Sequence, residues 1–273
     1  MPSLQKTVLV TGAGSGLGKV MSTALLAQGH RVILSSTNAV TLAKAIDESC
    51  AQPGQAVAIV SDLANDGACE SLIEQARNAF GHIDVLVNNA GLGSDSIRGD
   101  YLHNPFRFWE VDPAIFERFF QVNSTAPYRL ASLLAPDMIK HGWGRIVNVT
   151  TSLDTMLKVP VYGGSKAAIE AHTAVMANDL EGTGVTANVL VPGGAAVSRM
   201  TATLGLPTEQ LIPAEVMSPP VAWLCSHASD GFSARRIIAR QWDPALPPAQ
   251  AAQASSYPVA WTGFGVQRKN PDK

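Results

Sequence analysis

The chain has 273 residues, of which 46% are hydrophobic and 15% are charged. This length allows one domain or at most two, and the composition excludes a disordered protein and a coiled coil. The formal net charge is −2 and no basic run is longer than Arg235-Arg236 or Arg268-Lys269, so we expect no nucleic acid and no membrane surface as partner. The chain has no apolar stretch typical of a signal peptide or a transmembrane helix, which predicts a cytoplasmic protein.

Short β-branched runs alternate with helical patterns along most of the chain. The expected strands are Thr7–Val10, Arg31–Ser35, Ala56–Ser61, Asp84–Asn88, Arg145–Thr150 and Thr186–Val191. Apolar runs of this length between helices are typical of βαβ units. We therefore predict an α/β fold with a doubly wound, mostly parallel sheet between two helical layers. A further helix is expected over Pro113–Leu134, and the chain after Pro192 is expected to be rich in loops.

The first expected strand runs directly into a glycine-rich turn, TGAGSGLG at residues 11–18, which an amphipathic helix follows. Gly12, Gly16 and Gly18 predict a dinucleotide site in this context. Glycines allow a tight turn and let backbone amides approach a pyrophosphate, whose charge then lies at the positive end of a helix.

The end of the second expected strand carries no familiar specifier for the cofactor ribose. Ser36 and Thr37 stand where an acidic residue would bind a 2′-hydroxyl or an arginine would bind a 2′-phosphate. No carboxylate is present to repel a phosphate, and Ser36, Thr37 and Asn38 can donate hydrogen bonds to one. We therefore favour NADP over NAD, with Arg31 or Lys19 as the candidate nearby cations.

Further motifs follow in a consistent order: Asp62 in SDL, NNAG at 88–91, Asn123 in FQVNS, YGGSK at 162–166 and PG at 192–193. With these motifs the chain resembles the short-chain dehydrogenase/reductase family, in its single-domain form, over about residues 5–200. The resemblance implies one Rossmann dinucleotide-binding domain over residues 1–273 with NAD(P) as cofactor. It also implies a homotetramer or homodimer.

The resemblance assigns cofactor contacts residue by residue. The implied cofactor-binding residues are Gly12, Ser15, Gly16, Leu17, Gly18, Ser36, Thr37, Asp62, Leu63, Asn89, Ala90, Gly91, Tyr162, Lys166, Pro192 and Gly193. Asp62 would contact the adenine. Ser198 is the nearest counterpart of a threonine that the family often has shortly after the PG pair, so that contact stays open.

Tyr162 and Lys166 are four residues apart, so on a helix they share a face. Reduction of a carbonyl by a nicotinamide hydride also needs a proton, and a free phenol with a pKa of about 10 donates poorly near neutral pH. We expect the Lys166 ammonium to lower the pKa of Tyr162. By resemblance, Asn123 holds a water that relays protons through Lys166. The predicted function is an NAD(P)-dependent oxidoreductase that interconverts a ketone or aldehyde and an alcohol.

The hydroxyl donor for the substrate oxygen departs from the family's pattern. The family usually has a serine thirteen residues before the tyrosine, and Val149 occupies that position here. Thr151 and Ser152 follow. Strand register favours Thr151, and the family's preference for serine favours Ser152, which we select. Because of Val149 and the missing ribose specifiers, a cofactor-binding sensor or scaffold stays open as an alternative. An epimerase or dehydratase on the same fold is a third possibility, which the glycine spacing and the lack of a second lobe disfavour.

Two segments, at about 92–112 and 194–217, are expected to form the substrate loops beyond the carboxyl ends of the strands. Their apolar residues are Tyr101, Phe106, Trp109, Met200, Leu204, Leu206, Leu211, Ile212 and Met217. These predict an apolar small-molecule carbonyl or alcohol as substrate. His103 and Arg107 offer an alternative, since they could bind an anionic group.

The cysteines and histidines predict neither disulfides nor a metal site. Cys50, Cys69 and Cys225 are odd in number and form no CxxC pair. The histidines show no ligand spacing, so we expect no metal.

Overall fold

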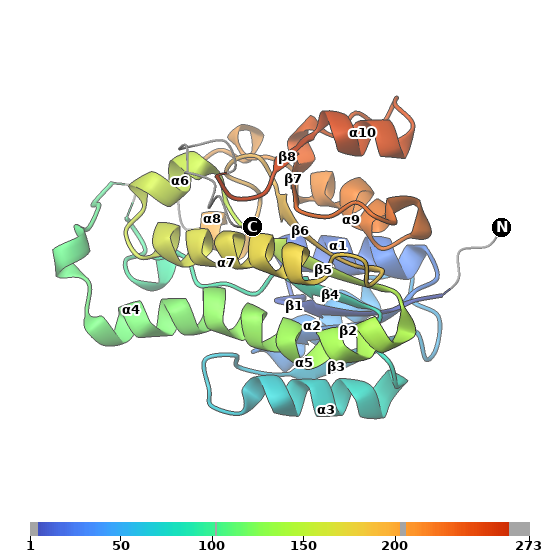
Figure 1. The fold of residues 1–273 in the computed structure, drawn as a ribbon. Helices are drawn as coiled ribbons and strands as arrows, with labels where there is room; N and C mark the ends of the chain where they lie inside the picture. Colours follow the sequence, from blue (N-terminus) through green and yellow to red (C-terminus); the bar gives the residue numbers. More distant parts are fainter. Residues whose placement is uncertain (1–4, 102, 203–205, 262–273) are drawn as a thin grey trace, which may run out of the picture.

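Figure 1 shows the computed structural model, which describes residues 5–101, 103–202 and 206–261. One eight-stranded sheet runs through the molecule in the order β3-β2-β1-β4-β5-β6-β7-β8. Every neighbouring pair is parallel except β7 with β8. The strands are β1 Thr7–Thr11, β2 Arg31–Ser36, β3 Ala56–Val60, β4 Val85–Asn88, β5 Gly144–Val149, β6 Val185–Val191, β7 Arg235–Ile238 and β8 Ser256–Pro258.

Helices cover both faces of the sheet, which confirms the predicted doubly wound α/β fold (Figure 1). The α-helices are α1 Gly16–Ala27, α2 Ala39–Asp47, α3 Ala68–Phe80, α4 Pro113–Phe120, α5 Ala126–His141, α6 Leu153–Lys158, α7 Tyr162–Asp179, α8 Arg199–Ala202, α9 Ser218–Leu224 and α10 Pro248–Ala254. Helices α1, α2 and α9 pack together on one face, and α3, α5 and α7 pack on the other. The central strands β1 and β4 to β6 are buried on both faces, which explains their continuous apolar sequence.

The strand order reverses beside β1, where β1 pairs with β2 on one side and with β4 on the other. In open parallel sheets a crevice opens at such a switch point, outside the carboxyl ends of the strands. The glycine-rich turn follows β1, and NNAG begins at the end of β4. The topology therefore brings these two motifs together.

The expected helix over Pro113–Leu134 is longer and less regular than its sequence suggests. Helix α4 begins at Pro113 and continues through a π-helical turn, Gln121–Thr125, into α5, which ends at His141. Such π-turns are rare inside α-helices and often occur at functional sites. This one contains Asn123, whose side chain is fully buried.

The chain after Pro192 has more regular structure than its sequence suggests. Helix α9 was not expected from the sequence. Its sequence SPPVAWL has prolines in the first turn, where a helix tolerates them, and it has no polar face that would give a helical pattern. Its residues from Pro220 to Leu224 are buried, and the helix packs against α1. Among the described residues, no helix is long and apolar enough to cross a membrane.

Candidate active site

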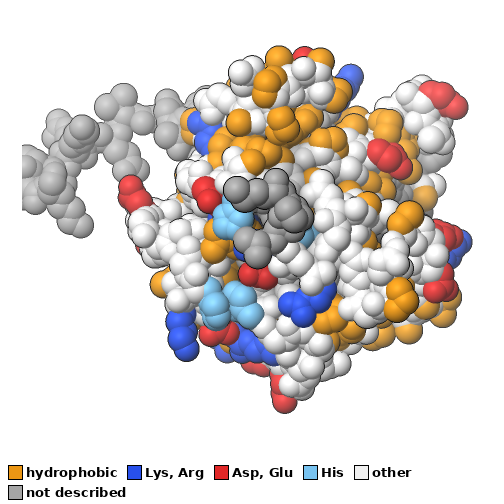
Figure 2. Space-filling view, turned by 90° about the vertical axis from the view of Figure 1, so that its right-hand side faces the viewer, with side chains coloured by type: hydrophobic (Ala, Val, Ile, Leu, Met, Phe, Trp, Pro, Cys, Tyr) orange, Lys and Arg blue, Asp and Glu red, His pale blue; other side chains and the backbone are white. Residues whose placement is uncertain are grey.

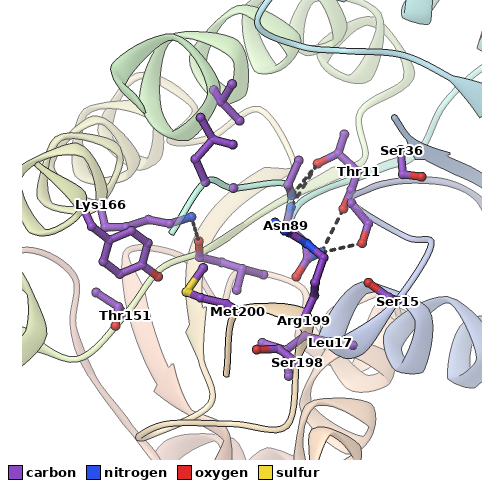
Figure 3. Close-up of a pocket in the computed structure, with 18 of the residues that line it drawn as sticks. Thr11, Ser15, Leu17, Ser36, Asn89, Thr151, Lys166, Ser198, Arg199 and Met200 are labelled. Atoms are coloured by element: carbon purple, nitrogen blue, oxygen red, sulfur yellow. Dashed lines mark hydrogen bonds between the residues drawn. The ribbon is translucent and has the colours of Figure 1, made fainter. Parts of the chain in front are cut away.

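A cleft of about 700 Å³ lies at the carboxyl ends of the central strands (Figure 3). It brings together most of the residues that the sequence motifs selected. Those lining it are Gly12, Ser15, Gly16, Leu17, Ser36, Thr37, Asp62, Leu63, Asn89, Ala90, Gly91, Tyr162, Lys166 and Pro192. Gly18 and Asn123 do not line it and lie against its wall, whereas Ser152 and Gly193 line a second cavity of about 420 Å³.

The glycine-rich turn passes so close to its surroundings that side chains would not fit. Gly12 has a φ of 65°, and a Cβ atom there would lie 2.8 Å from the Cα of Ala90. A Cβ atom on Gly18 would lie 2.2 Å from the carbonyl oxygen of Gly12. These two glycines let the start of α1 pack directly against the ends of β1 and β4.

The first turn of α1 is open toward the cleft. Ser15 occupies the N-cap position but its side chain makes no capping hydrogen bond, and the first turn has no acidic residue. The amide groups of this turn therefore stay available to an anion. Ser198 lies against the turn, since a Cβ atom on Gly16 would be 3.3 Å from it. The cradle fits the pyrophosphate of a dinucleotide.

The ribose end of the cleft is lined by hydroxyl groups. Ser36, Thr37 and Thr41 line it, and a Cβ atom on Gly14 would lie 2.4 Å from the Thr41 hydroxyl oxygen. The two candidate cations are engaged elsewhere: Lys19 pairs with Glu48, and Arg31 begins β2 at the opposite end of the strand. The expectation that Arg31 lies near a 2′-phosphate is therefore wrong.

Asn89 ties the end of β4 to the glycine-rich turn. Its side-chain nitrogen Nδ2 donates to the carbonyl oxygens of Thr11 and Gly12, at 3.0 and 3.1 Å (Figure 3). The Thr11 hydroxyl in turn accepts from the backbone amides of Asn89 and Ala90, both at 3.1 Å. The NNAG segment is thus fixed to β1 at the switch point.

Asp62, the expected adenine contact, lies at the rim of the cleft after β3. Its carboxylate accepts from the amide of Ala64 at 3.0 Å and pairs with Arg118 of α4 at 3.1 Å. Arg118 also lines the cleft. Sequence reasoning missed this arginine because α4 follows β3 only after a long stretch of chain.

Tyr162 and Lys166 lie on the first turns of α7 at the other end of the cleft. The Lys166 Nζ donates to the carbonyl oxygen of Val149 at 3.1 Å, and Figure 3 shows this bond beside Thr151. Burial raises the pKa of Tyr162 to about 12, and a hydrogen bond with the Thr151 side chain opposes the rise. Burial also lowers the pKa of Lys166 to about 8. The expected lowering of the Tyr162 pKa by Lys166 is therefore not found among the described residues.

Asn123 connects three parts of the site from the π-helical turn. Its side chain accepts from the Leu92 amide at 2.8 Å, and its Nδ2 donates to the Leu92 carbonyl oxygen at 3.0 Å and to the Ser165 hydroxyl at 2.9 Å. Asn123 thus holds the chain after NNAG against the first turn of α7.

The two candidate hydroxyl donors have different surroundings. Thr151 lines the cleft with Tyr162, and its side chain favours a lower pKa of that tyrosine. Ser152 is the N-cap of α6, where its hydroxyl accepts from the Thr155 amide at 3.1 Å, and it lines the second cavity instead.

The expected apolar substrate wall is present only in part. Tyr101 and Met200 line the cleft, but Trp109 is 70% exposed, and Met217 is buried in the core beneath α1. The expectation is wrong for these two and also for Phe106, Leu206, Leu211 and Ile212, which do not line the cleft. A loop sequence does not show which way its side chains point. Leu204 lies outside the described residues.

Polar residues that no sequence motif indicated also line the cleft. Ser94 lines it with a buried hydroxyl that has no hydrogen-bond partner among the described residues, and Thr155 lines it as well. Arg199 of α8 pairs with Asp95 at 3.4 Å, which connects the two expected substrate loops. Figure 3 shows Arg199 and Met200 between the two ends of the cleft.

Comparisons with known proteins show the family of the chain. The family model described as short chain dehydrogenase matches residues 6–207. A short-chain type dehydrogenase/reductase of Picea abies is 31% identical over 252 residues, which cover 85% of this chain and 90% of the relative. A 3-oxoacyl-[acyl-carrier-protein] reductase of Synechocystis sp. is 33% identical over 213 residues, covering 76% and 81%.

Solved structures are similar as well. The 3-ketoacyl-(acyl-carrier-protein) reductase of Brucella melitensis complexed with NADH has a TM-score of 0.72 at 25% identity, covering 84% of this chain and 93% of that one. A metagenomic short-chain oxidoreductase in complex with NADP has a TM-score of 0.66 at 26% identity, covering 81% and 90%. The family match, the fold and the assembled motifs lead to one conclusion: the chain belongs to the short chain dehydrogenase family and is an oxidoreductase acting on CH–OH or carbonyl groups.

Proposed function

We propose that the protein interconverts a small carbonyl compound and an alcohol by hydride transfer, with Tyr162 as general acid and base. The observation that carries the proposal is one cleft with an open phosphate cradle at one end and Tyr162, Lys166 and Thr151 at the other. When bound, a nicotinamide cofactor supplies or accepts the hydride.

Each side chain at the reactive end has a separate role in this proposal. The Tyr162 hydroxyl gives its proton to the developing alkoxide, or takes one from an alcohol in the reverse direction. Thr151, rather than Ser152, donates a hydrogen bond to the substrate oxygen, because Ser152 is engaged in capping α6. Lys166, held by the Val149 carbonyl, binds the cofactor beside Tyr162, and Asn123 holds the neighbouring backbone in place.

We propose NADP as the preferred cofactor. The end of β2 has no carboxylate that would repel a 2′-phosphate, and the hydroxyl groups of Ser36 and Thr37 line the cleft there. A fluorescence titration with NADPH and NADH tests this preference. A much tighter constant for NADH would overturn it.

The catalytic role is tested with a panel of ketones and secondary alcohols followed at the nicotinamide absorbance. We expect Tyr162→Phe to lower kcat by at least about 100-fold, because general acid and base catalysis contributes about that much. Its dissociation constant for the cofactor should stay within about threefold, since the lost interaction acts in the chemical step. Turnover unchanged in Tyr162→Phe would refute the role, and cofactor binding without turnover of any compound would favour a sensor or scaffold.

A further inference from the structure

A buried ion pair lies behind the reactive end of the cleft. Arg236 of β7 pairs with Glu170 of α7, and their side chains are 7% and 0% exposed. Arg236 lies beyond residues 6–207, the part of the chain that matches the family model. Neither residue lines the main cleft, and the proposed chemistry does not use either of them.

The pair contacts the chain directly after β5. The Arg236 guanidinium donates to the backbone carbonyl oxygen of Thr151, and also to the Thr150 hydroxyl at 3.4 Å. The Thr150 hydroxyl donates to the Glu170 carboxylate at 3.0 Å. The backbone of Thr151, whose side chain contacts Tyr162, is therefore held from behind by Arg236.

Helix α7 provides the other side of this arrangement. Tyr162, Lys166 and Glu170 follow at intervals of four residues and so share one face of the helix. Lys166 holds the carbonyl of Val149, and Glu170 holds the hydroxyl of Thr150. Together with the bond from Arg236 to Thr151, these contacts fix three consecutive residues at the end of β5 relative to the helix that carries Tyr162.

Stability alone does not account for this pair. Burying two charges costs a large desolvation free energy, and apolar residues of similar volume often stabilise a protein as well or better. The second carboxylate oxygen of Glu170 is buried without a hydrogen-bond partner in the described part of the chain. The arrangement is therefore imperfect as a stabilising device.

We propose that Arg236 is a positioning residue, which with Glu170 fixes the Thr151 backbone so that its hydroxyl meets Tyr162 and the substrate oxygen. This inference rests on the proposed function. It extends that function to a part of the chain outside the matched family region.

The test compares Arg236→Met, the double variant Arg236→Met/Glu170→Met, and Arg236→Lys. The single Met variant leaves Glu170 charged and unpaired, so we expect it to lower Tm by about 10 °C. The double variant removes both charges and should regain most of that loss. If Arg236 positions Thr151, kcat of the double variant stays about 10- to 100-fold low, with cofactor affinity unchanged.

Arg236→Lys keeps the charge but lacks the planar fork that reaches several acceptors. We expect a Tm near that of the parent and a kcat at least about fivefold lower, because the Thr151 backbone loses part of its support. Arg235→Met is the matched control, because the Arg235 side chain on the same strand donates to Ser256 of β8. Its kcat should equal that of the parent.

A second readout separates positioning from packing. The Thr151 side chain opposes the raised pKa of Tyr162, so moving Thr151 away should shift the pH profile of alcohol oxidation to higher pH. A double variant with the parent's Tm, kcat and pH profile would overturn the proposal. If Tyr162→Phe loses activity but the double variant is fully active, only the positioning role of Arg236 is refuted. The proposed function of the protein then still stands.

Discussion

Among single residues, the assignment of the hydroxyl donor depends on which neighbour each side chain meets. Thr151 and Ser152 are adjacent in the sequence, yet Thr151 lines the cleft and Ser152 caps a helix. The family's preference for serine favoured Ser152. Strand register favoured Thr151, because alternate residues at the end of a strand point to opposite sides.

These two positions can be separated by experiment. We expect Thr151→Val to lower kcat by about 10- to 100-fold, because it removes a hydrogen-bond donor near the reacting oxygen. Ser152→Ala should keep kcat within about threefold and lower the free energy of unfolding by about 1 kcal/mol, since it removes a helix cap. Turnover assays and urea denaturation of both variants check the pair. The opposite pattern would return the role to Ser152.

Among the helices and strands, the π-helical turn between α4 and α5 has a direct effect on the site, because it places Asn123 inside the protein. The Asn123 side chain there joins the chain after β4 to the start of α7. The motif FQVNS selected Asn123 by resemblance. That motif contains no indication of a π-turn, and the turn packs against α7, a segment about 40 residues further along the chain.

Asn123→Leu tests this structural role. The variant leaves the amide and the carbonyl of Leu92 without their partner and removes one hydrogen bond of the Ser165 hydroxyl. We therefore expect a loss of about 2 kcal/mol in the free energy of unfolding. Activity should fall as well, because the backbone beside the cleft loses its anchor. Unchanged stability in urea denaturation would contradict the role.

At the scale of the whole molecule, histidine side chains lie at the end of the sheet opposite the cleft. Figure 2 shows histidine side chains beside acidic and basic groups on this face. The rings of His82 and His141 stack at 3.8 Å, and His30 accepts from the amide of Lys6 at 3.2 Å. Burial lowers the pKa of both His30 and His82, and Asp84 partly opposes this.

Stability should therefore depend on pH. His30 and His82 have pKa values below 6.5 in the folded protein, so the unfolded chain binds more protons as the pH falls. Their contribution is fully present above about pH 6.5 and is lost progressively below it. Urea denaturation at about pH 7.5 and about pH 5.5 should show lower stability at the lower pH. His82→Asn should reduce the difference, whereas the exposed control His103→Asn should not.

Local sequence patterns were enough to locate strands β1 to β6, each within about one residue of its observed ends, because each strand is a short apolar run between helical segments. They were also enough to locate the glycine-rich turn, Tyr162 and Lys166, since their spacing along the chain is itself the signal. What surrounds these residues became visible in the folded chain alone. Three features depend on contacts between different segments of the chain: the Arg236–Glu170 pair, the approach of Thr151 to Tyr162, and the orientation of the loop side chains. No local sequence pattern records such contacts, because the segments come together only when the chain folds.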